Sequence, residues 1–270
     1  MSTSSHHLHM QAARLQTALV FKNCERIRAR LSFLSCCAPT STLPSVTNRA
    51  SCSTTGRKRY TVSASSLTPR DLSFDFESHA DLVRALQALQ DDPLQRDGGR
   101  IVTFRGNPQS KLFIIGEGPG AEEDRLGIPF VGESGQLLDR ILASVQLDSE
   151  SDVYVTNLVK RRPLNNRDPT ADEIHYYRPW LEAELRLVNP HVVVLAGRHA
   201  MKSFLNEKQG ITKVHGQWYD IGDGRWWMPV FHPSYLLRNP QWKPGAPKAL
   251  MWQDANAIKD KLLDLGHGHS

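Results

Sequence analysis

Four short apolar runs, each bounded by polar or turn-forming residues, recur along the chain. They cover residues 112–115, 152–159, 191–197 and 228–231. Runs of this length between turn residues are typical of buried strands. A further edge strand is expected at 101–104, and the aromatic residues around 218–227 suggest a hairpin.

Helical periodicity separates these runs. Apolar residues recur every three or four positions after Ser78, Ser134 and Thr170, and again across 199–205 and 249–265. This spacing places apolar side chains on one face of a helix. Ser78 is a candidate N-cap, and Thr170 with Glu173 has the spacing of a capping box. Strands alternating with helices predict an α/β fold with a parallel central sheet, covered by helices on both faces, in one domain at 75–265.

The sharpest turn in the sequence, Gly-Glu-Gly-Pro-Gly at 116–120, follows the first of these runs directly. Its three glycines and proline cannot continue a strand or a helix. It is no dinucleotide fingerprint, because Pro119 stands where a helix would start, and no Walker loop, because no Gly-Lys-Ser/Thr follows. Open α/β sheets bind ligands at the carboxyl ends of their strands, so this turn, with Glu117 inside it, marks the expected site.

Three other residues are expected to meet this turn. Asn157 lies at the end of the second run, His232 follows the last run, and Phe130 lies in the loop before the helix at Ser134. A side-chain amide can pair with the edge of a pyrimidine, and an aromatic ring can stack on its face. The set therefore suits a planar heterocycle.

Basic and apolar residues beside this rim suggest contacts with nucleic acid. A basic loop at 160–167 and an arginine in the turn after the last run could hold phosphates. Two adjacent leucines in that turn could enter a base stack. The residues expected to contact DNA are Lys160, Arg162, Ser234, Leu236, Leu237 and Arg238.

The positive charge of the chain belongs mainly to its first seventy residues. They contain ten Lys or Arg and one acid, whereas the other 200 residues contain 23 basic and 27 acidic side chains. A polyanion must therefore be bound through local patches. A segment rich in Ser, Thr and Arg and poor in acids is typical of an organelle transit peptide, and its Ser and Thr content favours the chloroplast over the mitochondrion. A disordered basic arm that binds nucleic acid is the alternative.

Cysteine placement limits the cofactors of the predicted domain. Cys24, Cys36, Cys37 and Cys52 all lie in or near this leader, and residues 53–270 contain none. The domain is therefore expected to have no disulfide, no metal site built on thiolates and no cysteine-ligated iron–sulfur cluster. No apolar run approaches the length of a membrane span, and we expect a monomer without a membrane partner.

Three separated segments together resemble the family 4 uracil-DNA glycosylases. The matching segments are GEGPGAEED with PFVG, then VTNLVKRRP, then HPSYLLRNP, and the resemblance covers residues 90–263. It implies the uracil-DNA glycosylase fold, a three-layer α/β/α arrangement with a central, mostly parallel four-stranded sheet. It also implies base excision repair of single- or double-stranded DNA, in which hydrolysis of the N-glycosidic bond of deoxyuridine releases uracil and leaves an abasic site.

The resemblance implies a role for each residue of the rim. Glu117 would position the attacking water and stabilise the oxocarbenium-like sugar, and His232 would stabilise the uracil anion. Phe130 would stack on uracil, and Asn157 would read its edge. A flipped-out base and a positioned donor for its developing charge are what this reaction requires. The uracil-binding residues so implied are Glu117, Gly118, Pro119, Phe130, Asn157 and His232.

One departure from the family pattern concerns its cofactor. Family 4 members usually bind a 4Fe–4S cluster through four cysteines, which match Arg161, Tyr177 and positions near Gln90 and Pro93. None of these is cysteine here. We therefore expect a relative without the cluster, in which Tyr177, Trp180 and apolar neighbours fill its place.

Each site residue also has a plainer interpretation. Glu117 could cap a turn, Asn157 could form one, and Phe130 and His232 could belong to the core. The three segments together favour catalysis. Two other functions stay open: a non-catalytic nucleic-acid-binding module of the same fold, and a glycosylase acting mainly on another deaminated base such as hypoxanthine or xanthine.

Overall fold

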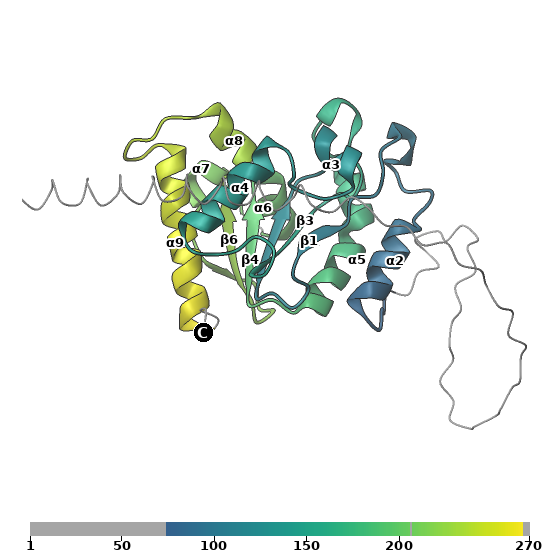
Figure 1. The fold of residues 1–270 in the computed structure, drawn as a ribbon, viewed down its shortest axis with the longest axis horizontal. Coiled ribbons are helices and arrows are strands. Elements are labelled where there is room, and N and C mark those ends of the chain that lie inside the picture. Colours follow the sequence, from purple (N-terminus) through teal and green to yellow (C-terminus); the bar gives the residue numbers. More distant parts are fainter. Residues whose placement is uncertain (1–73, 206, 267–270) are drawn as a thin grey trace, which may run out of the picture. The chain divides into compact units, whose positions relative to one another are not determined.

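A six-stranded sheet with the order β1-β3-β2-β4-β6-β5 is the centre of the fold (Figure 1). The computed structural model describes residues 74–205 and 207–266; the expected leader at 1–70, with all four cysteines, lies outside the described residues. The strands are β1 (Phe104–Gly106), β2 (Leu112–Gly116), β3 (Val153–Asn157), β4 (Val192–Ala196), β5 (Tyr219–Asp220) and β6 (Trp226–Val230).

The four inner strands are the four predicted from the apolar runs. β3, β2, β4 and β6 pair in parallel, which confirms the parallel core. β1 and β5 pair antiparallel at the two edges and extend the four-stranded parallel core. The pairing of β5 with β6 confirms the hairpin expected around 218–227. The edge strand predicted at 101–104 begins only at Phe104; before it, the backbone N–H of Val102 donates to the carbonyl of Lys160 at 2.8 Å.

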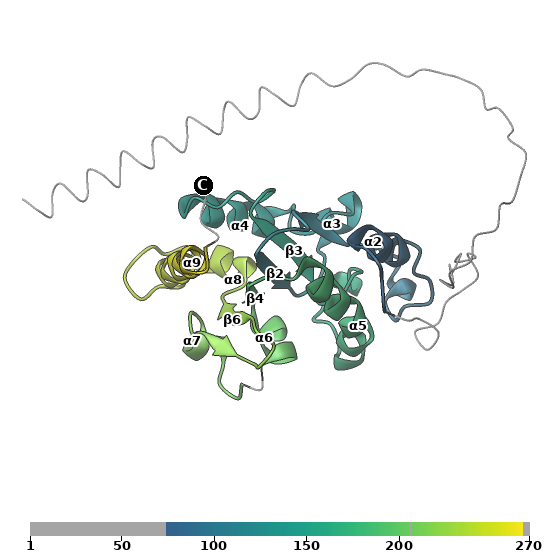
Figure 2. The same cartoon turned by 90° about the horizontal axis from the view of Figure 1, so that it is seen from below.

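Alternate residues of the inner strands divide between the two faces of the sheet. Leu112 and Ile114 point into one hydrophobic cluster, whereas Phe113 and Ile115 point into another. This is the two-residue period of a strand that is buried on both sides. Helices cover both faces, as Figure 2 shows, which confirms the expected three layers.

In the described part of the chain, a different set of helices packs on each face. The first cluster contains buried residues of α4 (Glu133–Ser144), α8 (Pro233–Arg238) and α9 (Pro247–Asp264). The second contains buried residues of α5 (Ala171–Val188), α6 (Arg198–Phe204) and α7 (Ile211–Val214). No helix in the described part of the chain is long and apolar enough to cross a membrane.

Two predicted helix caps are present. Ser78 Oγ accepts the N–H of Asp81 at 3.2 Å and begins α2 (His79–Gln87), which packs on α5. Thr170 Oγ1 accepts the N–H of Glu173, and the carboxylate of Glu173 in turn accepts the N–H of Thr170. This reciprocal capping box begins α5. The short α3 (Ala121–Leu126), η1 (Gln95–Asp97) and η2 (Leu164–Asn166) lie in the connecting loops.

Candidate active site

The carboxyl ends of the four parallel strands carry the polar residues that the sequence singled out. Glu117 follows β2, Asn157 ends β3 and His232 follows β6. The end of β4, which lies between β2 and β6, leads through Gly197 into α6. Neighbouring parallel strands present their carboxyl ends at one edge, so the side chains meet there although they are distant in sequence.

Phe130 and Asn157 come together above Gly116. A Cβ on Gly116 would lie 2.4 Å from Asn157 Oδ1 and 2.5 Å from the Phe130 ring, so only glycine fits at this position. Asn157 is 2% exposed, and its buried Oδ1 accepts no hydrogen bond from any residue that the structure describes. A buried amide oxygen without a partner costs free energy unless a ligand satisfies it. Asn157 is therefore poised to bind a polar edge beside an aromatic face.

Backbone geometry and one carboxylate hold the Phe130 loop. Phe130 has a φ of 55°, and its carbonyl oxygen would lie 1.7 Å from a Cβ on Gly135, so the loop needs glycine there. Glu123 of α3 accepts the N–H groups of Val131 at 2.9 Å and Gly132 at 2.8 Å. It also accepts the N–H of Gly120 at 3.1 Å.

Glu123 thus ties the glycine-rich turn to the stacking loop. It was not among the site residues predicted from the sequence. The signal available there was local, because Glu123 stands three residues after Gly120, the spacing of a capping box.

His232 is held as a neutral imidazole. The N–H of Ser234 donates to its Nδ1 at 3.2 Å, and Ser234 Oγ lies 2.8 Å from the same atom. Burial, with the charge of Arg238, lowers the pKa of His232 to about 4. A neutral ring whose Nδ1 accepts a hydrogen bond carries its proton on Nε2 and donates from there. The ring centroids of His232 and Phe130 are 5.8 Å apart, so this donor lies beside the aromatic face.

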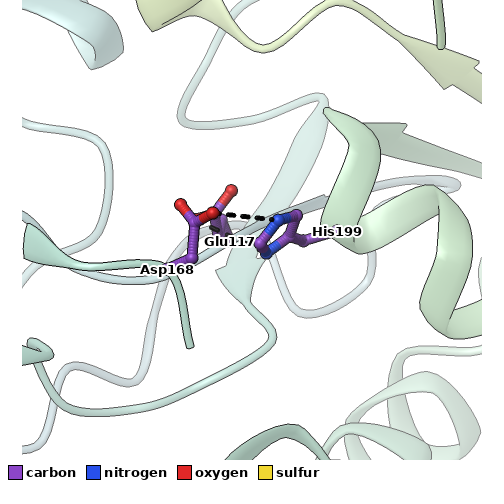
Figure 3. Close-up of side chains that lie close together, drawn as sticks. All are labelled: Glu117, Asp168 and His199. Atoms are coloured by element: carbon purple, nitrogen blue, oxygen red, sulfur yellow. Dashed lines mark ion pairs between the residues drawn. The ribbon is translucent and has the colours of Figure 1, made fainter. Parts of the chain in front are cut away.

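Glu117 lies beside two residues that the sequence analysis missed, Asp168 and His199 (Figure 3). Glu117 Oε1 is 3.7 Å from Nδ1 of His199, and Asp168 Oδ2 is 3.4 Å from Nε2 of the same ring. Burial raises the pKa of Glu117 to about 7, and the charge of Asp168 adds to the shift. Arg198, which donates to Asp168 Oδ2 at 2.5 Å, opposes it.

One of these two missed residues, His199, had a usable signal in the sequence. His199 lies two residues after Gly197, the glycine that follows the most apolar of the predicted strands. The rule that ligand sites lie at the carboxyl ends of strands, which selected Glu117 and Asn157, applies equally there. Asp168 lies in a loop between η2 and α5, and no local pattern pointed to it.

Two predicted DNA contacts are corrected by the structure. Lys160 is fully buried, and its Nζ donates to Glu184 Oε2 at 2.7 Å and to Thr156 Oγ1 at 2.6 Å. Its ammonium group is enclosed in a buried ion pair, so it cannot reach a phosphate. Leu236 is 1% exposed and belongs to the first core cluster, so it is no wedge.

The other predicted DNA contacts stay predictions. Arg238 is exposed, and Arg162 and Leu237 are half-buried. Arg162 donates to Asn166 Oδ1 at 2.7 Å within its own loop. Ser234 is half-buried and bonded to His232, which places it at the site as well as at the predicted DNA surface.

The expected iron–sulfur positions hold a buried polar network. Arg161 donates from Nε to Asp92 Oδ2 at 2.6 Å, and to the carbonyls of Gly99 at 2.5 Å and Leu89 at 3.1 Å. The hydroxyl of Tyr177 donates to the other oxygen of Asp92. These side chains offer no thiolate, and cationic Arg161 cannot ligate a metal ion. The residues at this place therefore do not fit a cluster.

Comparison with known proteins identifies relatives that share most of this domain. The family model described as the uracil DNA glycosylase superfamily matches residues 104–256. The type-4 uracil-DNA glycosylase of Thermotoga maritima is 43% identical over 148 residues, which cover 54% of this chain and 77% of that protein. The corresponding enzyme of Archaeoglobus fulgidus is 37% identical over 174 residues, covering 61% and 86%. That of Saccharolobus solfataricus is 41% identical over 169 residues, covering 60% and 76%.

Proposed function

The chain belongs to the uracil-DNA glycosylase superfamily, and we propose that it is a DNA repair enzyme that hydrolyses the N-glycosidic bond of deoxyuridine. One observation carries the proposal: Asn157, Phe130 and the Nε2 donor of His232 meet at the sheet edge next to Glu117. These are the groups needed to bind a flipped-out uracil and to stabilise both charges that develop as its bond breaks.

The leaving group is stabilised by a neutral donor. As the C1′–N1 bond breaks, negative charge gathers on the uracil, and the N–H at Nε2 of His232 donates to its oxygen. Because Ser234 fixes the tautomer, this donor needs no rearrangement during the reaction, which is the condition for efficient electrostatic stabilisation. Asn157 binds the base edge, and Phe130 stacks on its face.

Glu117 acts at the opposite end of the breaking bond. Its carboxylate is placed to orient a water molecule and to stabilise the positive sugar. A group whose pKa lies near the working pH is well suited to accept the proton of that water. The pKa of Glu117, raised to about 7 by burial, supports this role.

Oligonucleotides containing one uracil, single-stranded or opposite guanine or adenine, test the proposal. Abasic sites are revealed by alkali after incubation with the parent and with Glu117→Gln, His232→Asn and Glu122→Gln. Glu122 is an exposed carboxylate of α3 paired with Arg125 and serves as the matched control. Cleavage by the parent and the control, with a large loss in the other two variants, supports the enzyme. Binding without cleavage by the parent would favour the non-catalytic module, and preferential release of hypoxanthine or xanthine would favour the third function.

We further propose that DNA is held by Arg162, Ser234, Leu237 and Arg238. Arg238 is exposed one turn beyond the site, and Leu237 is the remaining candidate for a wedge. Arg238→Gln is expected to weaken binding and to flatten its dependence on salt, because one phosphate contact is lost. An unchanged salt dependence would remove Arg238 from the interface.

We infer that the enzyme works as a monomer without an iron–sulfur cluster. The support for the absence of a cluster is chemical. Arg161 and Tyr177, which match cysteines of the family type, both donate hydrogen bonds to Asp92. Iron and acid-labile sulfide measured in the full chain, purified without oxygen, are expected to be absent. About four irons per chain would contradict this inference. Light scattering tests the monomer.

We also propose that residues 1–70 direct the protein to an organelle, the chloroplast in preference to the mitochondrion. Their support is the near absence of acids in a segment with ten basic residues. A fluorescent protein fused after residue 70 is expected to enter the organelle. If the fusion stayed outside both organelles, the segment would instead be tested as a nucleic-acid-binding arm.

A further inference from the structure

The imidazole of His199 faces two carboxylates, which lie close to each other on one side of the ring. Its Nδ1 faces Glu117 at 3.7 Å, and its Nε2 faces Asp168 at 3.4 Å, so the ring meets the two acids through different nitrogens (Figure 3). The His199 side chain is 15% exposed, whereas that of Asp168 is 57% exposed. The Glu117 side chain is 30% exposed and also interacts directly with Asp168, so the three titratable groups form one cluster between the candidate active site and solvent.

This arrangement suits the movement of a proton. A neutral imidazole has one N–H and one acceptor nitrogen, so it can take a proton at Nδ1 while it gives one up from Nε2. Burial lowers the pKa of His199 and keeps the ring neutral when no proton is passing. The two gaps are slightly longer than hydrogen bonds, as catalytic contacts commonly are before substrate binds.

We propose that His199 and Asp168 relay to solvent the proton that Glu117 takes from the attacking water. The proposal rests on the proposed function, since it assigns the next step after proton transfer to Glu117. Both residues act through Glu117, so they are positioning residues of the reaction.

The step balances with water as the only co-reactant. The C1′–N1 bond breaks and its electron pair leaves with uracil, while the water oxygen forms a bond to C1′. The proton released by water passes to Glu117 and then to Nδ1 of His199. The proton on Nε2 passes to Asp168 and from there to solvent, where the uracil anion takes up a proton. Exchange with solvent restores the starting tautomer of His199.

The charges around this cluster come from two segments. Asp168 belongs to the loop before α5, and Arg198 and Lys202 belong to α6 with His199. Asp168 raises the pKa of Glu117, and Arg198 lowers it. Arg198 and Lys202 both lower the pKa of His199, after burial. Arg198 also forms an ion pair with Asp168, with 2.5 Å between Nη2 and Oδ2.

A metal ion is the competing occupant. Atoms of Glu117, Asp168 and His199 lie within 4.8 Å of one another, a spacing that could hold an ion. One imidazole nitrogen ligates a metal, however, and here the two carboxylates approach different nitrogens. The geometry therefore favours the relay.

Single-turnover uracil release by the full chain, measured across pH in the presence of EDTA, tests the relay. The variants are His199→Ala and Asp168→Asn. The matched controls are His175→Ala and Asp172→Asn, which change exposed residues of the same types on α5. Single turnover separates the chemical step from binding and product release.

His199→Ala is expected to lower the rate by at least about 10-fold, against the ~10²–10⁴-fold that a complete acid–base group contributes. Added imidazole is expected to restore much of the loss, because a free ring can occupy the space and carry the proton. Asp168→Asn is expected to lower the rate and to shift the acid limb of the profile below pH 7, because it removes a charge that raises the pKa of Glu117. The controls are expected to match the parent.

Each contrary result has a distinct meaning. A parent-like rate in His199→Ala, beside an inactive Glu117→Gln, would overturn the relay and leave the proposed function standing. A loss that imidazole does not restore would assign His199 a packing role and overturn the relay as well. A parent that EDTA inactivates would overturn it in favour of the metal ion. An inactive parent without EDTA would instead remove the proposed function.

Discussion

Arg161 offers the most direct measurement of what holds the domain together where the family type has its cluster. Its guanidinium is nearly buried and makes hydrogen bonds to the Asp92 carboxylate and to two backbone carbonyls. Arg161→Ala would leave the carboxylate of Asp92, which is 3% exposed, without its cation. Among the residues that the structure describes, the hydroxyl of Tyr177 and the N–H of Leu94 would be its remaining donors.

The expected cost follows from this burial. Breaking a buried ion pair by removing one partner costs about 3–5 kcal/mol, because the charge that stays behind has been taken out of water. For a domain of this size each kcal/mol lowers the melting temperature by about 2–4 °C, so the midpoint should fall by about 6–20 °C. Arg162→Ala is the matched control. It removes the next arginine, whose bond to Asn166 lies within one surface loop, and should change stability by less than about 0.5 kcal/mol.

Thermal and urea unfolding of the parent, both single variants and Asp92→Ala/Arg161→Ala provide the assay. The double variant should lose less than the sum of its single changes, because it removes both charges together. Equal melting temperatures for the parent and Arg161→Ala would refute the reasoning. The Asp92 network would then contribute nothing measurable, and another element would have to stabilise this end of the domain.

The remaining predictions concern the site. Gly116→Ala should abolish uracil release, because its methyl group would overlap Asn157 and the ring of Phe130. Gly210→Ala is the control and should be fully active, because the nearest atom to its added methyl group is 3.9 Å away. Full activity of Gly116→Ala would contradict the predicted pocket. The parent rate should fall about tenfold per pH unit below about 7, since protonation of Glu117 removes the form that accepts a proton, and a flat profile through pH 7 would exclude that role. Glu123→Gln should lower the free energy of unfolding by about 1.5–3 kcal/mol and slow uracil release, because a carboxylate that accepts three backbone N–H groups is replaced by a neutral amide. An unchanged free energy of unfolding would show that these hydrogen bonds do not stabilise the domain.

Much of the fold followed from local pattern. The parallel strands are apolar runs buried on both faces, and their length and the turn residues around them identified them. The caps at Ser78 and Thr170 were predictable because capping depends on residues within three positions. The hairpin predicted around 218–227 is confirmed by the antiparallel pairing of β5 with β6. The other edge strand was predicted too early in the sequence, since β1 has only three residues and begins at Phe104.

The site was predictable where strand ends define it. Glu117, Asn157 and His232 lie at the carboxyl ends of parallel strands, which share one edge of the sheet. The DNA contacts predicted for Lys160 and Leu236 were wrong for one reason. The type of a residue in a loop motif does not determine its burial, which depends on partners distant in sequence. Lys160 pairs with Glu184, which is 24 positions away on a helix.

The two histidines of this edge show how one side chain can serve two ends of a reaction. At His232 the N–H of Ser234 occupies Nδ1, so the ring has one tautomer and one use, which is to donate from Nε2. At His199 both nitrogens face carboxylates, and neither tautomer is fixed by a backbone donor among the described residues. A donor of fixed orientation suits the uracil anion, because its negative charge must be stabilised as soon as it develops. An exchangeable ring suits Glu117, whose proton must leave before the next substrate is attacked. Burial keeps both rings neutral, and their different partners give them different roles.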